Sequence, residues 1–172
     1  MDFQGIHDRL VAIRAPGLLR ADEPRAPDPK DKKDKGRAGD PYVVVDPAQL
    51  ADFLEVCRDD DRLHFEQQID ITATDPSKDS TDLWINVMLL SLKFRHRLSI
   101  KCILPKSTPE LPSTVRVYRA AQWNERECAE MFGITFVGHP DPRHILLPDD
   151  WVGCPLRKDY EFPKEYHGIS CE

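Results

Sequence analysis

The sequence predicts an α+β fold: a two-layer domain with a mixed or antiparallel sheet covered by helices, plus a long extended C-terminal tail. Two observations lead to this prediction. Between residues 42 and 136, a helical pattern is followed by consecutive strand patterns and then by a second helix. From residue 137 onward, prolines and aromatic side chains stand where a regular period would be needed.

The length and composition suit one such domain and exclude several functions. The 172 residues are 40% hydrophobic and carry a net charge of -6, which gives no electrostatic basis for binding nucleic acid or an anionic membrane. The longest uncharged apolar run, residues 87–92, is far shorter than the ~20 residues that cross a bilayer. No secretory signal or transit peptide is expected at the amino end.

The first 41 residues divide into two parts. Phe3, Ile6, Leu10 and Ile13 recur at helical spacing, which predicts an N-terminal helix within residues 1–15. Residues 16–41 are rich in proline and charge and poor in large apolar side chains. We expect them to form a disordered linker or an insertion, because such a segment buries too little surface to offset its ordering entropy.

Residues 42–136 hold the predicted domain. A β-branched strand at 42–45 leads to Asp46 and Pro47, a helix cap followed by proline at its favoured first position, and the helix should end near residue 58. Strands are predicted at 63–74, 83–92 and 98–104, with the last two forming an antiparallel hairpin about a charged turn. A second helix, about residues 120–132, should end at Gly133.

This second helix carries the most conspicuous carboxylate. Trp123, Glu127 and Met131 lie four residues apart, so we expect them to share an inward stripe. A buried Glu127 would either titrate in catalysis or pair with an arginine, and structural pairing is the favoured interpretation. Arg143 and Arg157 are the nearest candidate partners in sequence order.

The tail, residues 137–172, has the composition of an interface. Trp151, Leu156 and Tyr160 are apolar anchors in a chain that cannot fold alone, and Arg157, Lys158 and Asp159 add charge between them. Histidines and cysteines follow no compact metal-binding spacing, the five cysteines contain no C-x-x-C pair, and no glycine-rich phosphate loop occurs. We therefore expect no catalytic residue, bound cofactor or metal in this chain.

The last third of the chain also resembles a known family. The segments are Glu125-Arg126-Glu127, Met131-Phe132-Gly133-Ile134, Gly138-His139-Pro140-Asp141, Arg143, Ile145-Leu146-Leu147-Pro148, Trp151 and Pro155-Leu156-Arg157-Lys158-Asp159-Tyr160. Read in order, they resemble the C subunit of bacterial proton-pumping NADH:quinone oxidoreductase, respiratory complex I. The likeness extends from about residue 42 to 169. Ala129, Pro142, His144 and Cys154 depart from the usual pattern, which puts individual side-chain contacts in doubt.

The resemblance implies a non-catalytic structural subunit of the hydrophilic arm, supporting electron transfer from NADH to quinone coupled to proton translocation. The complex as a whole uses NADH, FMN, iron–sulfur clusters and quinone, and this subunit binds none of them. Its implied partners are the large quinone-site subunit (D) and the iron–sulfur subunits (B and I), peripheral to the bacterial inner membrane on the cytoplasmic side.

The residues expected to form partner interfaces or structural ion pairs are Glu125, Arg126, Glu127, Arg143, Trp151, Leu156, Arg157, Lys158, Asp159 and Tyr160. Two alternatives remain open. One is the equivalent subunit of a membrane-bound hydrogenase or NADH dehydrogenase-like complex, since a fold alone does not fix the electron donor. The other is a small stand-alone enzyme that uses Glu127 and His139 as acid and base.

Overall fold

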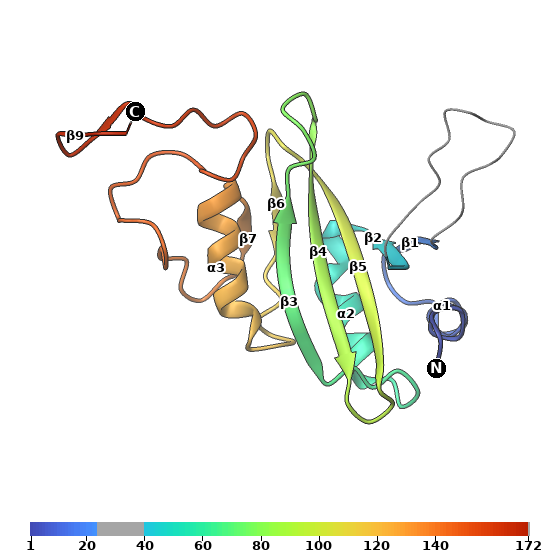
Figure 1. Ribbon diagram of the computed structural model, residues 1–172. Coiled ribbons are helices and arrows are strands. Elements are labelled where there is room, and N and C mark those ends of the chain that lie inside the picture. The colour runs from blue at the N-terminus through green and yellow to red at the C-terminus, as the bar shows by residue number, and fades with distance from the viewer. Residues whose placement is uncertain (24–39, 172) are drawn as a thin grey trace, which may run out of the picture.

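A computed structural model describes residues 1–23 and 40–171 of the chain, and shows the predicted α+β architecture (Figure 1). The main sheet has five strands in the order β1-β2-β5-β4-β3. β2 runs parallel to β5, and the other neighbouring strands are antiparallel, so the sheet is mixed. The strands are β1 (Leu18–Asp22), β2 (Tyr42–Val45), β3 (Gln67–Thr74), β4 (Asp82–Ser91) and β5 (His96–Pro105).

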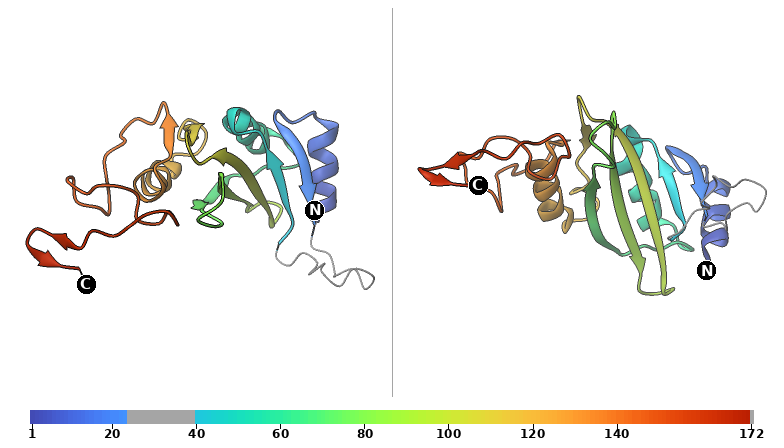
Figure 2. Two further views of the ribbon diagram at one scale, coloured as in Figure 1. Left: turned by 90° about the horizontal axis from the view of Figure 1, so that it is seen from above. Right: turned by 45° about the horizontal axis from the view of Figure 1, so that its top comes forward.

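One face of this sheet holds the hydrophobic core. Buried and less buried residues alternate along β4 and β5, as expected for strands with one covered face. Helix α2 (Leu50–Asp59) covers that face, whereas no described helix lies over the opposite face of β4 and β5 (Figures 1 and 2). The largest fully buried side chains include Phe53 and Leu54 of α2 and Ile85 and Ile100 of the sheet.

The amino end confirms one prediction and changes another. Helix α1 (Phe3–Ala12) forms with Asp2 as its cap and with Ile6 and Leu10 buried, as the helical spacing indicated. The segment expected to be a linker, however, begins with the strand β1. This strand has few apolar side chains, and it forms because its backbone is hydrogen-bonded to β2. The remainder of that prediction falls on residues 24–39, which lie outside the described part of the chain.

The predicted cap and hairpin are also confirmed. The Asp46 side chain accepts a hydrogen bond from the Ala48 backbone N–H, and the short 3-10 helix η1 (Pro47–Gln49) leads directly into α2. β4 and β5 pair antiparallel from Asp82↔Pro105 to Ser91↔His96. β3 begins at residue 67, later than expected, because the chain turns at 61–63 before it enters the sheet.

The second predicted helix is α3 (Ala121–Phe132), which lies beside the edge strand β3 (Figure 1). Gly133 ends it with a left-handed backbone, φ 74°, which glycine adopts without steric cost. Asn124 Nδ2 donates to Asp70 Oδ1 of β3 over 3.0 Å. The strand before the helix in sequence, β6 (Glu110–Pro112), pairs in parallel with the strand after it, β7 (Thr135–Val137). Both strands are too short to give a recognisable sequence pattern.

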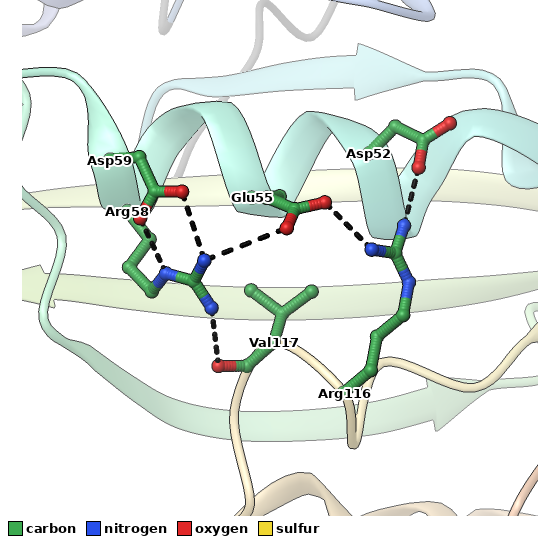
Figure 3. A network of polar contacts seen from close by, with 6 residues as sticks. All are labelled: Asp52, Glu55, Arg58, Asp59, Arg116 and Val117. Carbon is green, nitrogen blue, oxygen red and sulfur yellow. Dashed lines mark hydrogen bonds and ion pairs between the residues drawn. The ribbon is translucent and has the colours of Figure 1, made fainter.

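Polar side chains fasten the segment between β6 and α3 to the outer side of α2 (Figure 3). Arg116 bridges the carboxylates of Asp52 and Glu55. Arg58 donates to the Val117 carbonyl over 3.2 Å and also binds Asp59. α2 therefore fixes the start of α3 relative to the sheet.

Candidate functional site

The C-terminal tail leaves the body after β7 and is the least regular part of the molecule. Over residues 138–171 the structure has only the short hairpin of β8 (Glu165–Tyr166) and β9 (Ile169–Ser170). The tail folds back past α3 and then extends away from the sheet (Figures 1 and 2). An irregular segment of this kind needs other partners for its backbone polar groups.

Two charged side chains of α3 supply many of those partners. Arg126 Nε donates to the Arg143 carbonyl over 2.7 Å, and its Nη2 donates to the His144 carbonyl over 3.0 Å. One turn later, the Glu130 carboxylate accepts hydrogen bonds from three consecutive backbone N–H groups, those of Ile145, Leu146 and Leu147, over 3.0–3.2 Å. Both side chains are buried. α3 therefore holds five backbone groups of the tail by charge-assisted hydrogen bonds.

The third buried charge of α3 points toward the body instead. Glu125 is 0% exposed and accepts three hydrogen bonds of 2.7 Å, from the Ser113 hydroxyl, the Thr114 hydroxyl and the Thr114 backbone N–H. These bonds satisfy a carboxylate that would otherwise be too costly to bury. They fix α3 to the loop that follows β6.

A second attachment lies where β3 and β5 end. Lys106 Nζ is 2.6 Å from Asp75 Oδ2, and both side chains are almost inaccessible to solvent. The tail joins this pair twice: the Lys158 backbone N–H donates to Asp75 over 2.8 Å, and Arg157 Nη1 donates to the Lys106 carbonyl over 3.2 Å. Residues 157 and 158 are therefore held against the strand ends.

The charges at this attachment reinforce one another. Arg157 binds both oxygens of Asp159, each over 3.0 Å, and chiefly for that reason the pKa of Asp159 is lowered to about 2. Burial works to raise the pKa of Asp75, but the hydrogen bonds from Lys106 and the Lys158 N–H outweigh it, so the Asp75 pKa lies below its ordinary value. Both carboxylates are thus held in their charged form at neutral pH.

The aromatic residues of the tail pack mainly on one another. The rings of Trp151 and Tyr166 lie 5.4 Å apart, and those of Tyr160 and Phe162 lie 5.1 Å apart. Asp150 accepts hydrogen bonds from the Tyr166 hydroxyl and His167 Nε2. These contacts give the tail local order without a core of its own.

Several large apolar side chains of the tail are left in solvent, whereas the predicted anchors Trp151 and Tyr160 are half-buried. The tail's backbone is bound to α3 and to the strand ends, while its exposed hydrophobic residues include Leu146, Val152, Leu156, Phe162 and Ile169. Trp123 of α3 is also 62% exposed. Apolar exposure on this scale is typical of an interaction surface.

The structure corrects the prediction for Glu127. Glu127 is exposed, and so is Trp123, so the stripe expected to face inward faces outward. The buried face instead follows Ala121, Glu125, Cys128 and Phe132. Spacing alone misplaced the buried face. The buried carboxylate is that of Glu125, which is stabilised by Ser113 and Thr114, 12 and 11 residues earlier and outside the helix.

The predicted arginine partners of Glu127 bind other groups. Arg143 pairs with Asp141 over 2.7 Å, and its side chain is 79% exposed. Arg157 pairs with Asp159. Glu130, Asp75 and Lys106 were missed, although the four-residue spacing of Arg126 and Glu130, on one helix face, was a usable signal.

The acid–base arrangement of Glu127 and His139 does not form. His139 Nε2 is 3.1 Å from the Gln122 carbonyl, and its Nδ1 accepts from the Asp141 N–H over 3.0 Å. The hollow that His139 lines is walled by Glu125 and Arg126, whereas Glu127 lies on the exposed side of α3. Within residues 1–23 and 40–171, no three His, Cys, Asp or Glu side chains gather as a metal site would require.

Comparison with known proteins gives a consistent assignment. Residues 43–166 match the family described as "Respiratory-chain NADH dehydrogenase, 30 Kd subunit". The chain is 36% identical over 178 residues to the C subunit of NADH-quinone oxidoreductase from Chloroherpeton thalassium, covering 95% of this chain and 74% of that protein.

Two solved structures share the fold. A trypsin-resistant fragment of Nqo5 has a TM-score of 0.60 at 21% identity, covering 82% of this chain and 99% of the fragment. A chain of an archaeal membrane-bound sulfane sulfur reductase has a TM-score of 0.63 at 18% identity, covering 93% of this chain and 86% of that one. With a family match over most of its length, the chain belongs to the 30 kDa subunit family of respiratory NADH dehydrogenase, the family that includes the C subunit of NADH-quinone oxidoreductase.

Proposed function

We propose that this chain is a non-catalytic structural subunit of the hydrophilic arm of NADH:quinone oxidoreductase, and that its tail binds the neighbouring subunits. The observation that supports the proposal is that the backbone of the tail is bound to the body while many of its side chains are not. Its backbone is held by Arg126, Glu130 and Asp75, and several of its large apolar side chains remain exposed. Each such side chain contributes roughly 1.5 to 3 kcal/mol when fully buried, so several together can hold a partner.

The partners we propose are the large quinone-site subunit (D) and the iron–sulfur subunits (B and I). In this role the chain binds no flavin, cluster, quinone or metal, and it supports electron transfer from NADH to quinone coupled to proton translocation. None of the described helices is long and apolar enough to cross a membrane. We propose a peripheral position on the cytoplasmic side of the bacterial inner membrane, reached through the other subunits.

A second candidate is the equivalent subunit of a related membrane-bound complex with another electron donor. The fold shared with a chain of the sulfane sulfur reductase supports this second candidate, because similar folds occur in different complexes. The identity of the subunits that co-purify with this chain distinguishes the two candidates.

The test uses the full-length chain, because removing the tail would leave Arg126, Glu130 and Asp75 buried without their partners. A tagged chain with Val152→Ser, Phe162→Ser and Ile169→Ser is expressed in cells that lack the native copy. We expect fewer co-purifying complex subunits and lower NADH:quinone oxidoreductase activity in the membranes. The isolated variant should unfold at the same temperature as the unsubstituted chain.

The matched control replaces exposed apolar residues at the opposite end of the molecule. Val11 of α1 is 54% exposed and Leu19 of β1 is 64% exposed. The double variant Val11→Ser, Leu19→Ser should assemble normally. Equal recovery of subunits with the tail variant and the control would contradict the proposed docking role of the tail.

A further inference from the structure

The outer face of α3 carries two exposed side chains, Trp123 and Glu127. Trp123, Glu127 and Met131 are four residues apart and form what we call the Trp123 stripe. Trp123 is 62% exposed, Glu127 is exposed and Met131 is half-buried. Met131 packs against the hydrophobic core, whereas among residues 1–23 and 40–171 no element covers Trp123 or Glu127.

The indole ring is held in position before any partner arrives. Arg126 Cζ lies 5.1 Å from the ring centroid of Trp123, within the range of a cation–π contact. Arg126 is itself fixed by the carbonyls of Arg143 and His144. A rigid tryptophan loses little conformational entropy on binding, which is why tryptophans dominate many interfaces.

The stripe carries one negative charge. Glu127 lies one turn after Trp123, and within residues 1–23 and 40–171 its side chain has no hydrogen bond or ion pair. A second carboxylate, Asp70, is joined to the helix by Asn124. Asn124 is three residues before Glu127, so the two carboxylates lie along neighbouring positions of α3.

We propose that the Trp123 stripe docks a neighbouring subunit whose surface has an apolar pocket for the indole and a lysine or arginine opposite Glu127 and Asp70. The inference rests on the proposed function, since it assumes membership of a multi-subunit assembly. It gives the chain a second contact area, on α3, besides the tail, and it specifies the partner's chemistry.

The experiment compares three full-length tagged chains produced in cells without the native copy. Trp123→Ala removes the anchor, Glu127→Arg reverses the charge, and Leu19→Ala is the control with similar exposure on β1. The measured quantity is the amount of other complex subunits recovered per chain. We expect about a tenfold loss for Trp123→Ala and a clear loss for Glu127→Arg, with Glu127→Gln between Glu127→Arg and the unsubstituted chain.

The stability and the size of each isolated chain complete the test. Trp123→Ala and Leu19→Ala should unfold within a degree or two of each other; if Trp123→Ala unfolds much earlier, Glu127→Arg, which removes no packing, decides the question. Recovery equal to the control for both stripe variants overturns the proposal. So does an isolated chain that is a dimer and becomes monomeric in Trp123→Ala, because the stripe would then bind a second copy. Failure of the unsubstituted chain to recover any subunit would overturn the proposed function instead.

Discussion

Replacing Glu130 by alanine should release the tail from α3 while the sheet stays folded. The Glu130 carboxylate accepts hydrogen bonds from the N–H groups of Ile145, Leu146 and Leu147. Hydrogen bonds to a charged group contribute about 1.5 to 3 kcal/mol each, and we take about 1 kcal/mol for each of these because the loop is partly exposed. The expected cost is therefore about 3 kcal/mol of local stability.

Native-state hydrogen exchange measures this quantity at the affected amides. A loss of about 3 kcal/mol corresponds to roughly a hundredfold faster exchange. Glu130→Gln retains one oxygen that can accept from Ile145 and Leu147, so it should accelerate exchange roughly tenfold. Glu127→Ala, on the exposed side of the same helix, is the control and should leave these amides unchanged. If Glu130→Ala exchanges at the rate of the control, α3 does not hold the tail as described.

Three further predictions concern other contacts of the tail. Asp75→Ala should lower the free energy of unfolding by about 3 kcal/mol in urea titrations, because it leaves the buried ammonium of Lys106 with only the carboxylate of Asp159, 3.5 Å away. The double variant Asp75→Leu, Lys106→Met should recover most of this loss. A single variant no less stable than the double would argue against a buried pair. Acidification should weaken the fold. The pKa values of Asp159 and Asp141 are about 2 in the folded chain, against about 3.9 in an unfolded chain. The folded state therefore binds fewer protons, and the stability present above about pH 4 is lost toward about pH 2. The urea midpoint should fall over that window and less steeply in Asp159→Asn, whereas identical slopes would remove Asp159 from the effect. Gly153→Ala should disorder residues 150–160, because the added Cβ would lie 2.6 Å from the Tyr160 ring and because residue 153 has a φ of +87°. Hydrogen exchange should become faster in this segment and stay unchanged in the sheet. Unchanged exchange in residues 150–160 would contradict this prediction.

The elements that sequence predicted correctly depend on neighbouring residues. Asp46 and Pro47 start a helix through local capping, and Gly133 ends one because its left-handed backbone excludes most other residues. The β4–β5 hairpin follows from the alternation of buried residues on both sides of a short turn. These signals need no knowledge of distant parts of the chain.

The features that sequence missed depend on distant residues. Glu125 is buried because Ser113 and Thr114 meet it, and Asp75 is buried because Lys106 and the backbone of Lys158 meet it. β1 and the β6–β7 pair form through long-range backbone pairing, for which their three to five residues carry little side-chain signal. The outward orientation of Glu127 follows from the same cause, since the helix face was set by contacts that spacing does not encode.

The central claim is that other subunits cover the apolar side chains of the tail. Hydroxyl-radical footprinting of the isolated chain and of the purified complex tests it most directly, because oxidation reports the solvent exposure of individual side chains. We expect Leu146, Val152, Phe162 and Ile169 to be oxidised in the isolated chain and protected in the complex, while Val11 and Leu19 react similarly in both. Equal oxidation of the four tail residues in the two samples would contradict the claim.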